Sequence, residues 1–162
     1  VGSEMCIRDR GIKGAGGLTG MAVVMWLALT LGGVTRSLGT GQYVAGVVGD
    51  SVPLFALVPL VFVVTSGIAF ATGSSWGTFA IMLAVAIPLS NALGQPPAPF
   101  VAAVLSGGII GDHCSPISDT TIIASLASAT DHIEHVRTQL PYALIAGSIA
   151  AIGFAFIGAL LP

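Results

Sequence analysis

The chain has 162 residues, of which 54% are hydrophobic and only 7% charged, and its formal net charge is −2. A soluble domain carries roughly a quarter charged residues, so this composition indicates a membrane protein. The weak negative charge argues against a nucleic-acid partner. The two cysteines lie in unlike settings, which gives neither a disulfide framework nor a zinc site.

Residues 1–10, VGSEMCIRDR, differ in composition from everything that follows. They hold two of the five Lys and Arg residues and two of the seven acidic residues. They lack the apolar core of a signal peptide. The run resembles the tail that translated sequencing-adapter DNA leaves on a reading frame, and the alternative is a polar loop left by truncation of a longer protein. Both interpretations predict that the true N-terminal part is missing, and that residues 11–162 form the transmembrane unit.

Three segments are apolar and long enough to cross a bilayer, which takes roughly 20 apolar residues. They lie at 17–35, 52–70 and 140–161. The glycine-rich stretch 36–51 is predicted to be a loop or an interfacial segment. As a helix, residues 76–90 would reach only about 22 Å, so this piece is predicted to be re-entrant and not spanning.

The segment 99–129 is predicted to be a broken helix. Fully helical, it would run about 46 Å, well beyond the hydrocarbon core of roughly 30 Å. Pro116 lacks a backbone N–H, and Ser115 before it would make a good N-cap. We therefore expect one half-helix to end near Gly111 and a second to begin at Ser115. The charged run 130–137 is predicted to lie at the membrane–water interface.

Two polar breaks thus interrupt apolar sequence, at 72–78 and at 112–121. Ionisable side chains inside a membrane are costly and are usually functional. Interrupted helices of this kind form the binding sites of inverted-repeat transporters. Because no repeat occurs within the chain, we expect an all-α polytopic membrane protein that is one half of an inverted-repeat ion transporter, with broken or re-entrant helices.

The candidate cation- and proton-binding residues are the carboxylates, hydroxyls and imidazole of the two breaks. A carboxylate can hold a proton or a cation, although one Asp could instead cap a half-helix or pair with the imidazole. Hydroxyls offer neutral oxygens to a hard cation, although singly each could be bonded back to its own helix. The set comprises Asp112, Asp119, His113, Ser115, Ser118, Thr120, Thr121, Thr72, Ser74, Ser75 and Thr78.

Two of these residues, Asp112 and Asp119, are predicted to hold Na⁺. Seven residues is nearly two helical turns, so an unbroken helix would place both on one face. We expect Asp112, at the end of the first half-helix, to exchange protons. Asp119, about one turn inside the second half-helix and near its positive end, would be the more permanently charged ligand. His113 is left open between proton relay and partner of an Asp.

Two short runs of the sequence could suggest a metal site or an enzyme, but both interpretations are disfavoured. The run 132–135, HIEH, could suggest a metal site, but it is short, and a solvated interfacial segment is favoured. The run 112–115, Asp-His-Cys-Ser, could suggest a hydrolase or another intramembrane enzyme. A nucleophile needs a base and a third group that converge in space, whereas adjacent residues point in different directions.

The stretches 72–79 (TGSSWGTF) with 81–83 (IML), 111–121 (GDHCSPISDTT) and 130–140 (TDHIEHVRTQL) resemble signature stretches of the NhaC-type Na⁺/H⁺ antiporter family. The resemblance covers residues 21–162, and Ser74 stands where Thr is expected. It implies Na⁺/H⁺ exchange in a bacterial inner membrane. The lipid bilayer would be a partner, and a missing N-terminal half would supply the other repeat, so the fragment would be inactive alone. A homodimer is compatible with the sequence.

The main rival function is Na⁺-coupled transport of an organic anion on the same scaffold. No Lys or Arg lies between Arg36 and Arg137, which disfavours an anionic cargo. Half-helix N-termini can nevertheless bind carboxylates without them. In either case no resident cofactor is expected, because Na⁺ and H⁺ would be cargo. The sequence leaves the choice among Na⁺, Li⁺ and K⁺ open.

Overall fold

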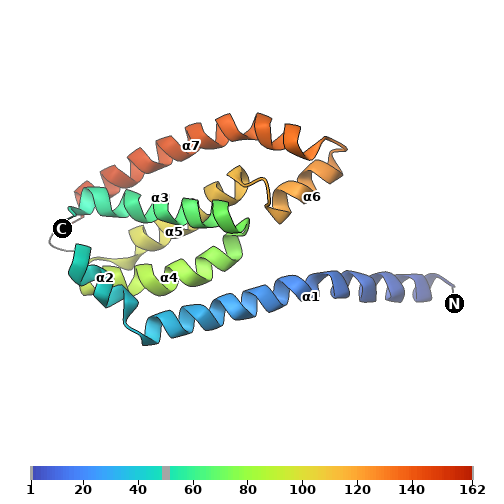
Figure 1. The fold of residues 1–162 in the computed structure, drawn as a ribbon, viewed down its shortest axis with the longest axis horizontal. Helices are drawn as coiled ribbons and strands as arrows, with labels where there is room; N and C mark the ends of the chain where they lie inside the picture. Colours follow the sequence, from blue (N-terminus) through green and yellow to red (C-terminus); the bar gives the residue numbers. More distant parts are fainter. Residues whose placement is uncertain (1, 49–51, 162) are drawn as a thin grey trace.

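The computed structural model describes residues 2–48 and 52–161, apart from the side chains of residues 2–6, 17, 18, 20, 21 and 24. Within these residues every regular element is an α-helix (Figure 1). In chain order the helices are α1 (Gly2–Ser37), α2 (Thr40–Val48), α3 (Leu54–Thr72), α4 (Ser75–Ala92), α5 (Pro97–Cys114), α6 (Asp119–Ala127) and α7 (His132–Leu160). The predicted all-α class is confirmed.

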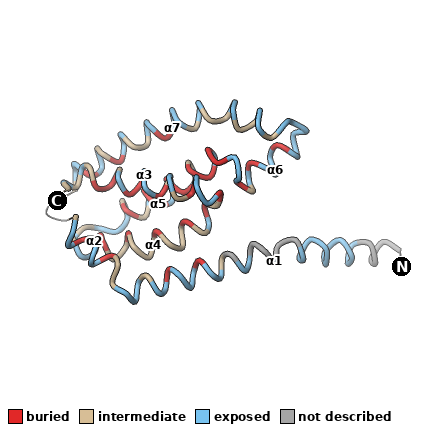
Figure 2. Tube along the Cα trace, in the orientation of Figure 1, coloured by how far each residue is buried: buried red, intermediate tan, exposed pale blue. Residues whose placement is uncertain are grey.

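Helices α3 and α5 form the centre of the bundle (Figure 1). Helix α4 returns antiparallel to α3 after a tight turn, α7 packs along α3 and α5, and α1 packs along α4. Figure 2 shows that buried residues concentrate on α3, α4 and α5, whereas α1 and α7 are mostly exposed. The turn between α3 and α4 and the link between α5 and α6 lie at the same end of the bundle.

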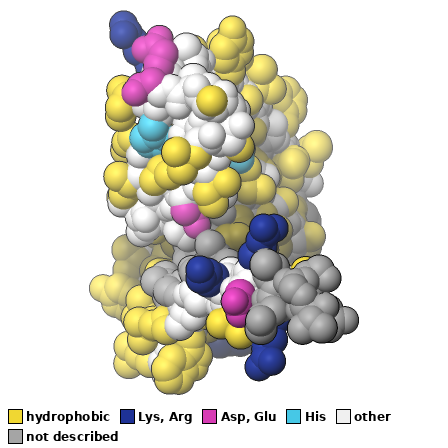
Figure 3. Space-filling view, turned by 90° about the vertical axis from the view of Figure 1, so that its right-hand side faces the viewer, with side chains coloured by type: hydrophobic (Ala, Val, Ile, Leu, Met, Phe, Trp, Pro, Cys, Tyr) yellow, Lys and Arg dark blue, Asp and Glu magenta, His cyan; other side chains and the backbone are white. Residues whose placement is uncertain are grey.

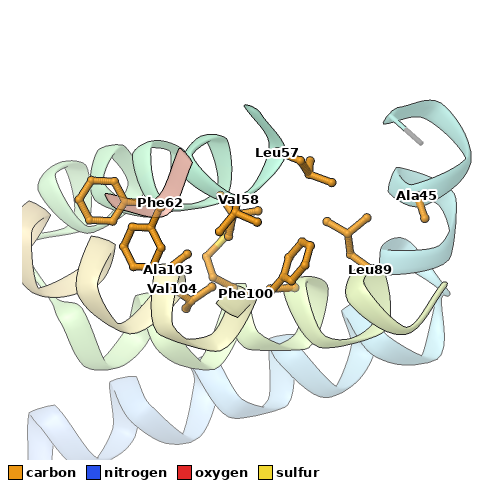
Figure 4. Close-up of a cluster of buried hydrophobic side chains, with 12 residues drawn as sticks. Ala45, Leu57, Val58, Phe62, Leu89, Phe100, Ala103 and Val104 are labelled. Carbon is orange, nitrogen blue, oxygen red and sulfur yellow. The ribbon is translucent and has the colours of Figure 1, made fainter. Parts of the chain in front are cut away.

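The apolar core joins α3, α4 and α5 (Figure 4). Phe100, Val58 and Val104 are fully buried there. The ring of Phe62 packs against that of Phe154 on α7, with centroids 5.3 Å apart. Such a ring pair adds about 0.5–1.5 kcal/mol beyond the burial of its area. These contacts fix α5 and α7 against α3, and they leave the two polar breaks at one end of the packed core.

Two glycines let α5 approach α3 at backbone distance. A Cβ at Gly107 would collide with the carbonyl oxygen of Phe62, and one at Gly111 would collide with that of Ser66. Small residues four apart bring two membrane helices close together because no side chain separates their backbones. The C-terminal end of α5, and with it the α5–α6 link, is therefore held against the end of α3.

Three of the described helices, α3, α4 and α7, are long and apolar enough to cross a membrane. Helices α5 and α6, bent by 51° at their junction, pass the same test as one broken span or re-entrant loop. The predicted spans 52–70 and 140–161 correspond to α3 and α7, although α7 begins earlier, at His132. The predicted span 17–35 lies within α1, whose first part is formed by residues 2–10.

Two sequence-based expectations need correction. The stretch 36–51 is not a loop throughout, because residues Thr40–Val48 form helix α2; the alternative of an interfacial segment stays a prediction, and residues 49–51 lie outside the described part. Glycine disfavours helices, but packing overrides propensity here. A Cβ on Gly41 would come within 2.5 Å of Pro88 of α4, so the glycine permits close contact. The prediction that residues 76–90 are too short to cross the membrane is also wrong, because helix α4 has 18 residues and is long enough to span.

Candidate functional site

The two predicted breaks lie against each other. Between α3 and α4 the chain turns at Gly73, whose φ of +65° favours glycine. A Cβ at this position would lie 2.7 Å from the carbonyl oxygen of Ile117, in the α5–α6 link. Glycine is therefore required twice at this point, for the backbone conformation and for the approach of the link. The structure thus brings together segments that are about 40 residues apart in the chain.

The break between α5 and α6 differs from the predicted one. Helix α5 continues past Gly111 to Cys114, and Ser118 is the N-cap of α6, accepting the backbone N–H of Thr121 at 3.4 Å. Ser115 ends α5 and accepts the N–H of Ile117 at 3.4 Å within the link. Pro116 therefore lies in the link, where its missing N–H leaves no helical hydrogen bond unmade. The expectation that Ser115 begins the second half-helix is wrong.

One carboxylate of the link region is buried and surrounded by hydroxyls. Asp112 is only 3% exposed, and Ser118 is fully buried. Ser118 Oγ donates to Asp112 Oδ1 at 2.9 Å, and Thr120 Oγ1 donates to Asp112 Oδ2 at 2.8 Å. The two hydroxyl oxygens are themselves 2.8 Å apart. We call Asp112, Ser118 and Thr120 the Asp112 cluster.

The Asp112 cluster has more short contacts than hydroxyl protons. Three oxygen–oxygen contacts of 2.8–2.9 Å connect its members. Each hydroxyl carries one proton. If both protons point to an ionised carboxylate, none is left for the contact between the two hydroxyls. A proton on Asp112 completes the ring, because the carboxyl then donates to one hydroxyl and frees that hydroxyl to donate to the other. All three contacts can be hydrogen bonds at once only if the cluster holds one proton more than its two hydroxyls carry.

The second carboxylate has a different setting. Asp119 is half-buried and is the first residue of α6, not one turn inside it as expected. Its Oδ1 accepts the backbone N–H of Thr120 at 2.8 Å, a local bond at the helix start. A negative charge at this position is favourable because of the positive end of the helix dipole. The helix is also broken between Asp112 and Asp119, so the shared face expected for an unbroken helix does not form.

His113 does not pair with either carboxylate through a hydrogen bond. It is exposed, and its Nδ1 lies 2.8 Å from the carbonyl oxygen of Ile109, one turn back in α5. A carbonyl only accepts, so Nδ1 carries the hydrogen and donates it. The Asp-His-Cys-Ser run consequently forms no catalytic triad within the described structure, since His113 contacts neither Asp112 nor Ser115 by a hydrogen bond.

The hydroxyls of the first break form their own cluster. Thr78 Oγ1 donates to the carbonyl of Ser74 at 2.8 Å and lies 3.3 Å from Thr72 Oγ1. Ser74 is the N-cap of α4 and accepts the N–H of Gly77 at 3.5 Å. Ser75 and Thr78 are buried, whereas Thr72 is exposed. Much of this hydroxyl chemistry is used locally, in capping the turn.

His132 contacts the α5–α6 link, a role that the sequence reasoning did not predict. Its Nε2 lies 2.6 Å from the carbonyl oxygen of Pro116, and its Nδ1 lies 3.3 Å from Ser125 Oγ. The imidazole therefore ties the start of α7 to the link and to α6. Within the described residues no group of three or more His, Cys, Asp and Glu side chains could hold a metal ion, so the HIEH run forms no such site. The position of His132 directly after Asp131, the N-cap of α7, gave no signal of this contact.

Figure 3 looks onto the end of the molecule where the breaks lie. Charged side chains lie at the upper left of this face, near its centre and in its lower half, with a histidine close to the upper group, and hydrophobic and uncharged groups surround them. Asp112 is the buried acid among the described residues, whereas the other charged groups seen on this face lie at the surface.

Comparison with known proteins gives a consistent result. The model of the Na⁺/H⁺ antiporter family matches residues 7–159. An uncharacterized protein of Haemophilus influenzae is 38% identical over 91% of this chain and 28% of its own length. The malate-2H⁺/Na⁺-lactate antiporter of Bacillus subtilis is 38% identical over 65% of the chain and 22% of its own length.

The Na⁺/H⁺ antiporter NhaC of Alkalihalophilus pseudofirmus is 36% identical over 54% of the chain and 19% of its own length. The chain therefore covers at most 28% of the length of any of these three relatives. No solved structure matches it.

Proposed function

Because this chain belongs to the Na⁺/H⁺ antiporter family, we propose that the full-length protein exchanges Na⁺ for H⁺ across the inner membrane of a bacterium. The observation that carries the proposal is the Asp112 cluster: a buried carboxylate whose two oxygens each accept a hydroxyl, at a break between two membrane helices. The resemblance of the two breaks to the family's signature stretches supports the same conclusion.

The exchange follows from charge balance in a buried site. An ionised carboxylate that lacks a partner is costly inside a protein or a membrane. A proton on Asp112 neutralises it and completes the ring of hydrogen bonds. A Na⁺ ion also neutralises it, and would be coordinated by the carboxylate and by the hydroxyl oxygens of Ser118 and Thr120. Because H⁺ and Na⁺ would neutralise the same carboxylate, binding of one displaces the other.

The proposal also requires further ligands for the cation and a second half of the protein. The Asp112 cluster offers four oxygens at most, so further ligands would come from the hydroxyls of the first break, from Asp119 or from the other half of the protein. The chain matches at most 28% of the length of the relatives named above. We therefore propose that the complete protein has a second, N-terminal half and that these residues alone do not transport.

The second candidate is exchange of organic anions on the same scaffold. The observation in its favour is the similarity to a relative named as a malate-2H⁺/Na⁺-lactate antiporter. Against it, the sequence has no Lys or Arg between Arg36 and Arg137 to pair with a carboxylate cargo. We therefore favour the inorganic cation.

The test uses the full-length protein reconstituted in vesicles that contain a pH-sensitive dye. An imposed Na⁺ gradient is expected to drive protons in the opposite direction, so that Na⁺ outside alkalinises a vesicle interior as H⁺ leaves. Protein-free vesicles and the Asp112→Asn variant serve as controls. A dye response to a malate or lactate gradient, with none to Na⁺, would instead establish the second candidate.

A further inference from the structure

A polar cavity of about 260 Å³ lies where α5, α6 and α7 meet. Its walls come from all three helices: His113 from α5, Thr120, Thr121 and Ala124 from α6, and His135 and Gln139 from α7. One water molecule occupies about 30 Å³ in the liquid, so the cavity has room for several. Imidazole, hydroxyl and amide groups give those waters hydrogen-bond partners.

This cavity is separated from the buried carboxylate by one hydroxyl group. Thr120 lines the cavity, and its Oγ1 also contacts Asp112 Oδ2 at 2.8 Å. Asp112 itself is 3% exposed, and Ser118 is fully buried. Thr120 is therefore the member of the Asp112 cluster that faces both the cavity and the carboxylate. Movement of its hydroxyl would bring the cavity into contact with Asp112.

The cavity wall also carries a proton acceptor in a fixed tautomer. Because Nδ1 of neutral His113 donates to the carbonyl of Ile109, the second ring nitrogen, Nε2, has a free lone pair. Among the described residues Nε2 has no hydrogen-bond partner. His135 brings a second imidazole to the same cavity, and Gln139 an amide. These groups can pass a proton along or hold the water shell of a monovalent cation.

We propose that this cavity is the aqueous approach by which H⁺ and a hydrated monovalent cation reach Asp112, with Thr120 connecting the cavity to the carboxylate. This inference rests on the proposed exchange function and adds the path to it. It assigns His135, Gln139 and Ala124 to the wall of the ion path, a role that the sequence motifs did not indicate.

The test places a single cysteine in the cavity wall of the full-length protein. In a full-length parent freed of cysteines, with Cys114 replaced by Ala, the variant Ala124→Cys is compared with Ile123→Cys. Both positions are exposed and lie on α6, but Ala124 lines the cavity and Ile123, 63% exposed, does not. Each variant is treated with a positively charged and with a negatively charged methanethiosulfonate reagent, and labelling and Na⁺-driven proton movement are measured separately.

At Ala124→Cys the positive adduct is expected to slow exchange at least about tenfold, because a fixed like charge repels the entering cation. The negative adduct should slow it less, and Na⁺ should protect the cysteine from labelling. At Ile123→Cys exchange should stay within about twofold of the unlabelled protein. Complete labelling of Ala124→Cys without loss of exchange, or equal losses at both positions, would overturn the proposed path. An unlabelled parent that shows no Na⁺-driven proton movement would instead overturn the exchange function itself.

Discussion

Replacing Asp112 by Asn is expected to abolish exchange while preserving the local structure. An Asn side chain has the shape of a protonated carboxyl, with one oxygen that accepts and one group that donates. Its amide can donate to Thr120, which donates to Ser118, which donates back to the Asn oxygen. The ring of three contacts at 2.8–2.9 Å is thereby kept. The cation, however, loses the negative charge that would hold it.

The Asp112→Ala variant measures how much the carboxyl group of Asp112 contributes to the stability of the protein. Without the carboxyl group, Ser118 and Thr120 can still bond each other, but their two bonds to residue 112 are lost. An intramolecular hydrogen bond contributes about 0.5–1.5 kcal/mol to stability, so the loss of both costs about 1–3 kcal/mol. We therefore expect Asp112→Ala to lower the free energy of unfolding by about 1–3 kcal/mol relative to Asp112→Asn, with both variants inactive.

The assay combines two measurements on the full-length protein. Unfolding in mixed detergent micelles gives the stability difference, and dye-loaded vesicles give the exchange rate. If Asp112→Asn is as destabilised as Asp112→Ala, the ring does not depend on a proton at Asp112. If Asp112→Asn exchanges at the native rate, Asp112 is not the proton-exchanging group.

Three further predictions follow from single contacts. Asp119→Asn should retain measurable exchange in vesicles, because its carboxylate accepts a backbone N–H at the helix start and, among the described residues, has no hydrogen bond to the side-chain oxygens of the Asp112 cluster. Gly73→Ala should destabilise the protein by at least about 1 kcal/mol in detergent unfolding, since φ is +65° and a Cβ would press on the Ile117 carbonyl. His132→Gln should cost about 1 kcal/mol and speed amide hydrogen exchange in α6, because the bond to Pro116 is lost.

Each of these predictions has a matched control. Asp112→Asn, inactive in the same vesicles, is the reference for Asp119→Asn, and equal loss in both would refute the distinction between the two acids. Gly67→Ala, in an open position of α3, should be neutral or stabilising; Gly73→Ala behaving the same way would contradict the close contact of the breaks. His135 lies one turn along α7, and among the described residues its side chain has no hydrogen bond to the link. Equal rates of amide hydrogen exchange in α6 for His135→Gln and His132→Gln would therefore contradict the role of His132.

The sequence by itself determined the class of the protein and the location of its chemistry. Apolar segments of membrane length, and polar runs inside them, are local properties of the chain, so the spans at α3 and α7 and the breaks at 72–78 and 112–121 were predictable. The same holds for Asp112 as a candidate, because a carboxylate between apolar runs is costly and is seldom placed there without a function.

Only the tertiary structure decided which polar residues meet. Whether Ser115 or Ser118 begins α6 depends on competing hydroxyl bonds within the link, and both serines fit the local pattern. The stretch 40–48 is helical because it packs closely on α4, which its glycine content concealed. The contact of Gly73 with Ile117 and the bond of His132 to Pro116 join residues that are distant in sequence. The packing of α5 and α7 on α3 brings these residues together, and a local sequence pattern does not contain that information.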